Sequence, residues 1–257
     1  MIDNKDDYLH TLIETYRILA SDRDNITYDY QGNDQKFLGT DSQYIRDKIS
    51  HFDKDTVGKY NFPNPHGGGT AYINTIDKNG LGVSLIQSNF YGIGSRIGVG
   101  SYGFFLHNRG CGFNLIKDHP NSLGPNKKPL HTLSPTIWSK NGSLDFISGT
   151  RGGRYQPQLL AQTILPYILG KSSFEEIIKK PRWAMEYFGP NTTSNIKFEF
   201  IDEFEVTSLE DKGHRISVEN KLIGGYGPIS TIYKNTDGKF IGVPDIRVGT
   251  EKAFNNS

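Results

Sequence analysis

The most informative segment of the sequence is Gly67-Gly68-Gly69-Thr70-Ala71-Tyr72, a glycine run that ends in a threonine and opens a strand-like segment. Glycines permit strained backbone conformations, and a threonine hydroxyl beside a strained peptide bond can attack the preceding carbonyl group. This attack would make Thr70 a new N-terminus, whose α-amine, with a reference pKa of about 7.7 to 8.0, could act as general base for its own hydroxyl. For these six residues alone, a flexible loop before an ordinary strand is the alternative interpretation.

The rest of the chain is predicted to form blocks of helices and blocks of strands. Helical periodicity favours helices over 4–22, 41–52, 157–169, 173–180 and 202–212, with Ser173 as an N-cap. Strand-like runs occupy 71–77 and 81–87, joined by an Asn-Gly turn, and then 102–106, 136–139, 143–148, 196–200, 216–219, 229–234 and 240–243. The polar, Pro- and Gly-rich run 61–69 indicates an exposed linker. This order predicts a layered α+β domain.

Composition excludes several classes of protein. The 257 residues suffice for one large domain with a substantial core. A formal net charge of +1, spread without a basic block, provides no patch for nucleic acid. The longest mainly apolar stretch, 159–169, is far shorter than the ~20 residues that cross a bilayer. Because the acidic N-terminus lacks the pattern of a secretory signal, a cytoplasmic location is expected.

The single Cys111 excludes an internal disulfide and a multi-thiolate metal site. As a lone cysteine it is also a candidate nucleophile, but it lies between two glycines without an obvious base. His66 has no second histidine at metal-ligand spacing. No metal site is therefore expected, and no organic cofactor is expected either.

Further motifs follow Thr70 in a fixed order. They are Asp77-Lys78-Asn79-Gly80, Val83-Ser84-Leu85-Ile86-Gln87-Ser88-Asn89, Gly124-Pro125-Asn126-Lys127-Lys128-Pro129-Leu130, Ser134-Pro135-Thr136, Gly149-Thr150-Arg151-Gly152-Gly153 and Asp245-Ile246-Arg247 with Gly249. In this order the chain resembles the γ-glutamyltranspeptidase family of N-terminal-nucleophile (Ntn) hydrolases over nearly its whole length. The resemblance implies a four-layer αββα sandwich, which is either complete or incomplete in this chain.

The resemblance also implies roles for individual residues. Gly69–Thr70 is the expected cleavage site, Thr70 the nucleophile, and Ser88 the hydroxyl that hydrogen-bonds Thr70. The backbone N–H groups of Gly152 and Gly153 are expected to form the oxyanion hole. The residues expected to line the acyl-donor pocket are Asn89, Arg109, His131 and Thr132.

The chain departs from the family pattern at the donor pocket. Typical members have acidic residues for the α-amino group of the donor, whereas this chain has Arg109-Gly110-Cys111-Gly112, and a cationic arginine would repel an ammonium group. In this chain, His131-Thr132 replaces the family's pair of serines for the donor carboxylate. Both side chains can still donate hydrogen bonds, although His131 could equally be a structural histidine. The stretch 114–121 is too short for the family's lid loop. In this respect the chain resembles the lidless branch of the family, which includes glutathione hydrolase-like proteins and cephalosporin-acylase-like amidases.

These features predict how the chain is organised and what it does. Residues 1–69 are expected to be a remnant of the C-terminal region of the large subunit, together with the cleavage linker, and 70–257 the small, catalytic subunit. A separate large-subunit polypeptide or a homo-oligomer is expected to complete the sandwich. The first functional hypothesis is self-cleavage followed by γ-glutamyl hydrolysis or transfer, with glutathione as the natural donor. The alternatives are an Ntn amidase for a larger acyl group, such as glutaryl, and a non-catalytic binding or assembly module.

Overall fold

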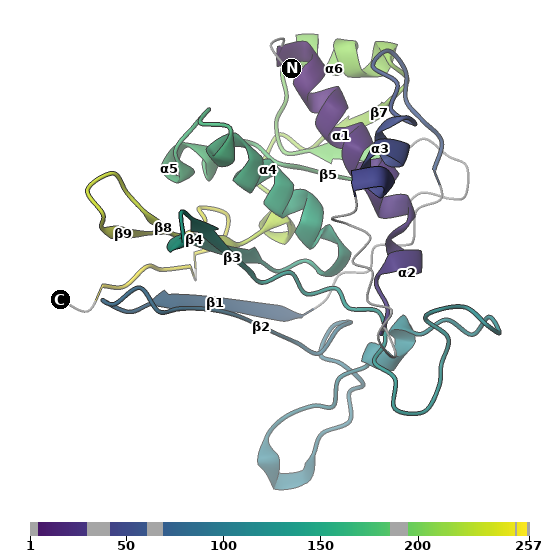
Figure 1. The fold of residues 1–257 in the computed structure, drawn as a ribbon, viewed down its shortest axis with the longest axis vertical. Helices are drawn as coiled ribbons and strands as arrows, with labels where there is room; N and C mark the ends of the chain where they lie inside the picture. Colours follow the sequence, from purple (N-terminus) through teal and green to yellow (C-terminus); the bar gives the residue numbers. More distant parts are fainter. Residues whose placement is uncertain (1–4, 30–41, 61–68, 186–194, 250, 256–257) are drawn as a thin grey trace.

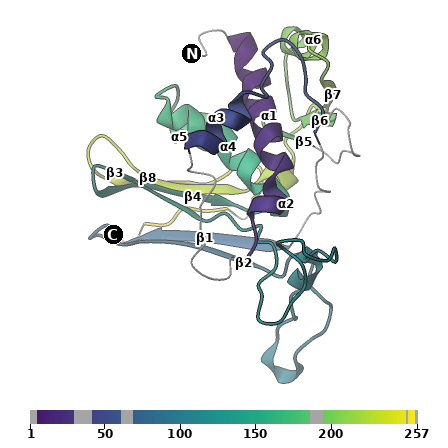
Figure 2. The same ribbon diagram turned by 45° about the vertical axis from the view of Figure 1, so that its right-hand side comes forward.

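The computed structural model describes residues 5–29, 42–60, 69–185, 195–249 and 251–255. Three layers are stacked in this part of the chain: helices, a four-stranded antiparallel sheet and a two-stranded hairpin (Figure 1). This is the predicted α+β arrangement and corresponds to three layers of an αββα sandwich. Among the described residues, no helix forms a layer on the outer face of the hairpin (Figure 2).

The hairpin begins at the threonine that follows the glycine run. Strands β1 (Thr70–Ile76) and β2 (Gly82–Ser88) are antiparallel, and the first residue of β1 lies opposite the last residue of β2. Their connection is the predicted Asn-Gly turn, in which the Asp77 carboxylate accepts two backbone N–H groups and Gly80 adopts a φ of 86°. Side chains alternate between half-buried and exposed along both strands, so this register determines which residues face the next sheet.

The central sheet separates the hairpin from the helices. Its strands are, in spatial order, β3 (Thr136–Lys140), β4 (Ser143–Thr150), β8 (Ile229–Lys234) and β9 (Phe240–Val243). Helices α4 (Gln156–Ile168) and α5 (Phe174–Ile177) cover the face away from the hairpin. Buried apolar residues of the sheet and these helices, including Phe146, Leu159 and Phe174, form the first core.

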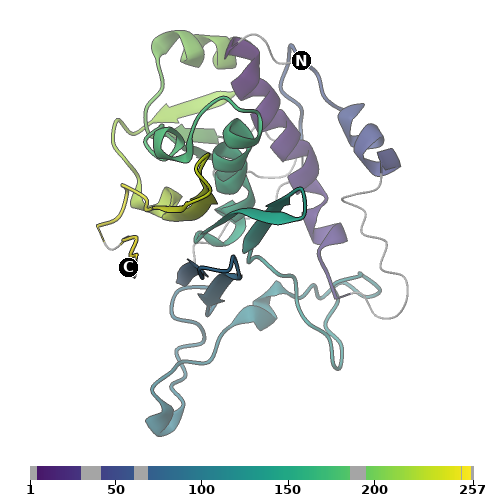
Figure 3. The same cartoon turned by 60° about the vertical axis from the view of Figure 1, so that its left-hand side comes forward.

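A second core joins the N-terminal helix to a small mixed sheet. This sheet consists of β5 (Trp183–Met185), β6 (Asn195–Phe198) and β7 (Arg215–Val218), with β6 and β7 parallel. Helices α1 (Lys5–Ser21) and α6 (Glu203–Asp211) pack on it, and Figure 3 shows α1 running from α6 towards the hairpin end of the molecule. Ile13 of α1 is fully buried in this core. The segment before Thr70 therefore folds together with the segment after it.

Most predicted elements are confirmed within a few residues. The predicted helix over 41–52 is α3 (Ser42–Ile49), and a further short helix, α2 (Arg23–Ile26), follows α1. Helix α5 is shorter than predicted, but Ser173 is its N-cap and forms a capping box with Glu176. The linker prediction over 61–69 falls outside the described residues except for Gly69, which is exposed.

One predicted strand is wrong and one strand was not predicted. The expected strand over 102–106 is a projecting loop with a 3-10 turn, η2 (Gly100–Tyr102), and a single β-bridge between Gly98 and Phe105. Positive φ angles at Gly100 and Gly103 turn the chain too sharply for a continuous ladder. Strand β5 has only three residues, too few for an alternating pattern to be recognisable.

Candidate active site

Thr70 lies at the start of β1, where its side chain is hydrogen-bonded to the neighbouring strand β2. Its hydroxyl donates a hydrogen bond to Ser88 Oγ at 3.0 Å. Ser88 Oγ in turn accepts the backbone N–H of Phe90 at 3.1 Å. The predicted hydrogen bond between Thr70 and Ser88 is therefore present, and this chain of bonds fixes the direction of the Thr70 hydroxyl.

Gly69 is confined by the loop that follows β2. Its backbone N–H donates to Gly92 O at 3.2 Å, and a Cβ added at Gly69 would lie 2.4 Å from that oxygen. Real Cβ atoms do not approach a backbone oxygen so closely. Glycine is therefore required at the position before Thr70 for steric reasons.

We predict that Gly69→Ala slows cleavage of the 69–70 bond. The added methyl group must push the Gly92 carbonyl or the bond itself aside, and a misplacement of about 1 Å reduces the rate of an oriented reaction by up to about 100-fold. Gel electrophoresis of the purified protein over time measures the rate. Gly98→Ala is the matched control, because its Cβ would meet Phe105 at an ordinary 3.9 Å. Equal cleavage rates in the two variants would contradict the steric requirement.

The glycine turn predicted to form the oxyanion hole directly follows β4. Gly152 and Gly153 adopt φ angles of 114° and 56°, both of which favour glycine. Gly153 is buried and begins the 3-10 turn η4 (Gly153–Tyr155), which leads into α4. Whether the N–H groups of these two glycines bind an oxyanion stays a prediction; the structure shows the glycine-specific turn that such a site requires.

Contacts between the stacked sheets place this turn at the same end as Thr70. The ring of Tyr72 packs on Gly149, where a Cβ would lie 2.3 Å from the ring, and Gly82 packs similarly on Ile147. Strands β1 and β4 therefore run in opposite directions in the stack, so residues that precede Tyr72 lie near residues that follow Gly149. Thr70 precedes Tyr72 by two residues and Gly152 follows Gly149 by three, so both lie beyond this contact at one end of the stack.

A second loop, 224–228, is joined to the glycine turn by hydrogen bonds. Arg151 donates from Nε to Gly227 O at 2.8 Å and from Nη2 to Gly224 O at 3.2 Å. The hydroxyl of Thr150 donates to Pro228 O at 2.8 Å. The conformation of the glycine turn therefore depends on the 224–228 loop.

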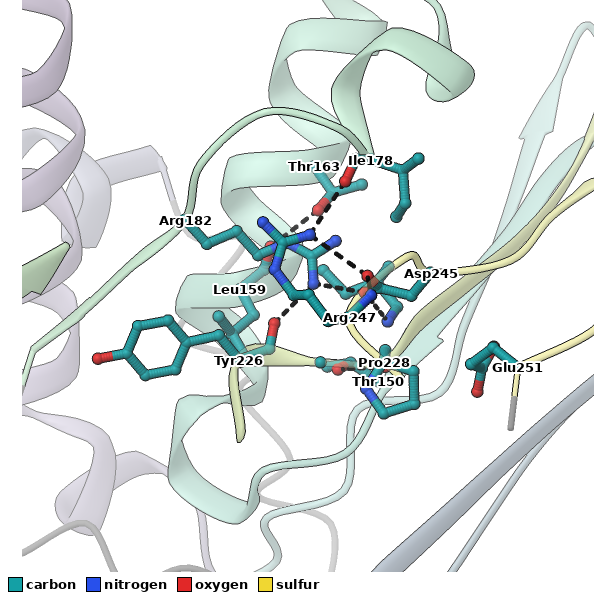
Figure 4. A network of polar contacts seen from close by, with 12 residues as sticks. Thr150, Leu159, Thr163, Ile178, Arg182, Tyr226, Pro228, Asp245, Arg247 and Glu251 are labelled. Carbon is teal, nitrogen blue, oxygen red and sulfur yellow. Dashed lines mark hydrogen bonds and ion pairs between the residues drawn. The ribbon is translucent and has the colours of Figure 1, made fainter. Parts of the chain in front are cut away.

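A buried ionic network anchors that loop in turn (Figure 4). Arg182 donates to Tyr226 O at 2.6 Å and pairs with Asp245. Asp245 also contacts Arg247, whose Nε donates to Glu199 at 2.7 Å. All four charged side chains are buried, so each depends on its partners for stabilisation. The motif Asp245-Ile246-Arg247 thus has a structural role, because it positions the 224–228 loop to which the glycine turn is hydrogen-bonded.

Arg109 joins the predicted donor-pocket residues to the nucleophile. Its guanidinium donates to Ser88 O at 3.3 Å and to Thr132 Oγ1 at 3.5 Å, and lies 5.3 Å from the centre of the Phe90 ring. Burial lowers the pKa of Arg109, but an arginine stays protonated at neutral pH. Ser88 thus contacts Thr70 through its side chain and Arg109 through its backbone.

His131 and Asn89 complete the predicted set. Partial burial, together with the charges of Arg109 and Arg23, lowers the pKa of His131 below its ordinary value, which favours the neutral imidazole. Asn89 Nδ2 donates to Ile93 O at 3.3 Å, which ties it to the loop after β2. The structure therefore gathers Thr70, Ser88, Arg109 and Thr132 by direct contacts, with His131 beside them.

Sequence reasoning missed the residues that support the site. Arg151, Arg182 and Glu199 carry no pattern that distinguishes them from solvated surface charges. For Arg151, the available signal was its place inside the glycine turn.

Among the described residues, no group of three or more His, Cys, Asp or Glu side chains is arranged to hold a metal ion, and no helix has the length and apolarity of a membrane span.

Comparison with solved structures defines the class of fold. Cephalosporin acylase from Bacillus halodurans matches with a TM-score of 0.82 at 24% identity, over 100% of this chain and 46% of that chain. A γ-glutamyltranspeptidase T380A mutant from Helicobacter pylori matches with a TM-score of 0.58 at 24% identity, over 69% of this chain and 99% of that chain. The fold is that of the Ntn hydrolases.

Sequence comparison defines the family. The family model described as gamma-glutamyltranspeptidase matches residues 1–254. The glutathione hydrolase-like YwrD proenzyme of Bacillus subtilis is 31% identical over 87% of this chain and 42% of its own length, and the oxamate amidohydrolase proenzyme of Klebsiella pneumoniae is 31% identical over 71% and 36%. The chain belongs to the γ-glutamyltranspeptidase family, and it spans less than half the length of these relatives.

Proposed function

We propose that this chain carries the catalytic residues of an Ntn amidohydrolase or acyltransferase whose nucleophile is Thr70, released by cleavage of Gly69–Thr70. The observation that carries the proposal is the hydrogen bond from Thr70 to Ser88 at the start of β1. The required glycine at position 69 supports it, because a constrained peptide bond precedes the hydroxyl. Residues 70–257 then form the catalytic part, and 1–69 are the segment that precedes cleavage.

The proposed reaction proceeds through an acyl-threonine. Thr70 Oγ bonds to the acyl carbon, and its proton passes to the free α-amine. The N–H groups of Gly152 and Gly153 stabilise the tetrahedral oxyanion, which collapses by breaking the C–N bond as the proton moves to the leaving amine. Water then cleaves the ester, or an amine takes the acyl group.

Two classes of acyl donor are candidates. The names of the relatives favour γ-glutamyl amides such as glutathione, because several are glutathione hydrolases. Amides of other acids form the second class, favoured by Arg109 in the pocket and by the relative named for oxamate. Both classes use the same nucleophile and the same oxyanion hole.

Turnover of acyl anilides tests the proposal. The purified protein should release p-nitroaniline from an acyl-p-nitroanilide, and rapid acid quenching should trap the acyl group on the peptide that begins at Thr70. Mass spectrometry locates the added mass. Acyl transfer at any other residue would refute the assignment. An uncut chain that is inactive on every anilide would favour the non-catalytic alternative.

We further propose that additional polypeptide covers the outer face of the β1–β2 hairpin. The outward residues of this face include Ile73, 63% exposed, and Leu81, 71% exposed, together with Val83 and Leu85. A contiguous apolar surface of this kind marks an interface. The relatives are more than twice as long as the matched part, so a large-subunit segment of their kind is the proposed occupant, and a second copy of this chain is the alternative.

Purification from the native host measures this association. The protein should elute with a second polypeptide, or at the mass of a homo-oligomer, when light scattering is recorded. Ile73→Thr with Leu85→Thr should weaken the association, whereas Leu115→Thr, an exposed loop residue, should not. A monomeric and active chain would disprove the covering segment.

A further inference from the structure

Arg109 introduces a positive charge beside the proposed nucleophile. Its two terminal nitrogens contact Ser88 O and Thr132 Oγ1, and both of these acceptors are neutral. In the described part of the chain, no carboxylate forms an ion pair with Arg109. Because a guanidinium has five N–H donors and these contacts use two, three donors remain for a ligand.

The surroundings of Arg109 increase its preference for an anion. The Phe90 ring lies under the guanidinium and limits its contact with water on that side. The positive charge of Arg109 also acts on His131, the neighbour of Thr132 in the sequence, so the cation belongs to the predicted donor pocket. An ammonium group placed here would meet like charge, whereas a carboxylate could accept a bidentate pair of hydrogen bonds.

We infer that Arg109 is a specificity-determining residue that binds a carboxylate of the acyl donor and disfavours an adjacent ammonium group. The donors would then be monoamides of dicarboxylic acids that lack an α-amino group, rather than γ-glutamyl amides. This inference rests on the proposed function, with Thr70 as nucleophile. It departs from the prediction that glutathione is the natural donor.

Three anilides with the same five-carbon chain test the inference. Glutaryl-p-nitroanilide carries a carboxylate alone, γ-glutamyl-p-nitroanilide carries the carboxylate and an ammonium, and pentanoyl-p-nitroanilide carries neither. The protein should hydrolyse the glutaryl compound with a kcat/KM at least about 10-fold above the other two. A preference for the γ-glutamyl compound would overturn the inference while leaving the proposed function intact.

Variants of Arg109 separate recognition from a structural role. Arg109→Met should reduce kcat/KM for the glutaryl compound by about 10- to 100-fold, mainly through KM, and change the pentanoyl compound little. Arg109→Lys should restore part of the glutaryl preference, because it keeps the charge. Arg109→Glu should raise the γ-glutamyl rate relative to the glutaryl rate. An equal loss on all three substrates would assign Arg109 to positioning of Ser88 and refute the inference.

A binding measurement keeps the inference testable without turnover. Saturation-transfer NMR on the full chain compares glutarate, L-glutamate and pentanoate, with Arg215→Met, an exposed arginine on β7, as the matched control. Glutarate should bind best, and Arg109→Met should abolish the difference while Arg215→Met keeps it. If glutarate binds in this way but no anilide is cleaved, the proposed function fails, and only the assignment of Arg109 as a carboxylate-binding residue stands. Absence of any glutarate preference would overturn the inference.

Discussion

A Thr70→Ala protein should remain uncut and should hydrolyse acyl amides at least about 10⁴-fold more slowly than the wild type, since removal of a catalytic nucleophile typically has an effect of this size. Both reactions depend on the same oxygen: before cleavage it attacks the carbonyl of Gly69, and afterwards it attacks the substrate. Gel electrophoresis measures the first reaction and anilide hydrolysis the second.

Thr70→Ser is the matched variant, because it keeps the hydroxyl and should retain both reactions at a reduced rate. Circular dichroism should show a native fold for both proteins, since Thr70 lies at the edge of the hairpin outside the two buried cores. Ser88→Ala should slow both reactions because it removes the acceptor at 3.0 Å from Thr70. Normal turnover by Thr70→Ala would exclude Thr70 as the nucleophile.

Arg247→Met should destabilise the fold by about 3–5 kcal/mol, the usual effect of removing one partner from a buried ion pair. The change leaves Glu199 buried without its main cation and removes donors to Ile178 O and Lys180 O, at 3.0 and 2.8 Å. For a domain of this size, the loss corresponds to a fall in Tm of roughly 10 °C. Urea denaturation measures the free energy of unfolding directly.

Arg215→Met again serves as the control, since a change at an exposed arginine should alter stability by no more than about 0.5 kcal/mol. The glycine turn should respond as well. At urea concentrations below the denaturation midpoint, Arg247→Met should have a lower kcat than the wild type, because the network positions the loop that Arg151 contacts. Stability equal to that of the control would show that the network is dispensable.

The same network predicts how stability depends on pH. Burial alone would raise the pKa of Asp245, but the charge of Arg182 and hydrogen bonds from the backbone N–H groups of Ile229 and Arg247 outweigh it and hold the pKa below 3.8. A carboxyl group whose pKa is lowered by folding stabilises the protein above its unfolded pKa. That contribution should therefore be complete above about pH 5 and be lost as the pH falls below 3.8. In Asp245→Asn this part of the acid dependence should disappear.

The hairpin and the position of Thr70 at its start could be predicted because their signals are local. An Asn-Gly pair between two alternating runs determines the turn, and the glycine run marks the point where the first strand begins. The N-cap at Ser173 was predicted for the same reason, since a capping box involves residues only three positions apart. Local chemistry of this kind is visible without knowledge of the tertiary structure.

The support of the site could not be predicted because it depends on contacts between distant segments. Glu199 and Arg247 are 48 positions apart, and Arg151 contacts a loop 73 to 76 positions further along the chain. Each charge in the sequence resembles a solvated surface residue until the fold buries it. The approach of Gly92 O to Gly69 is likewise a tertiary constraint, although the glycine itself was conspicuous.

The most direct test of Thr70 as an N-terminal nucleophile is the N-terminal sequence and intact mass of the purified wild-type protein. We expect two fragments, one that ends at Gly69 and one that begins with Thr70-Ala71-Tyr72. Incubation with any co-purifying polypeptide should increase the proportion of the cut form. An intact chain after prolonged incubation, both alone and with such a polypeptide, would contradict the assignment of Thr70 as an N-terminal nucleophile.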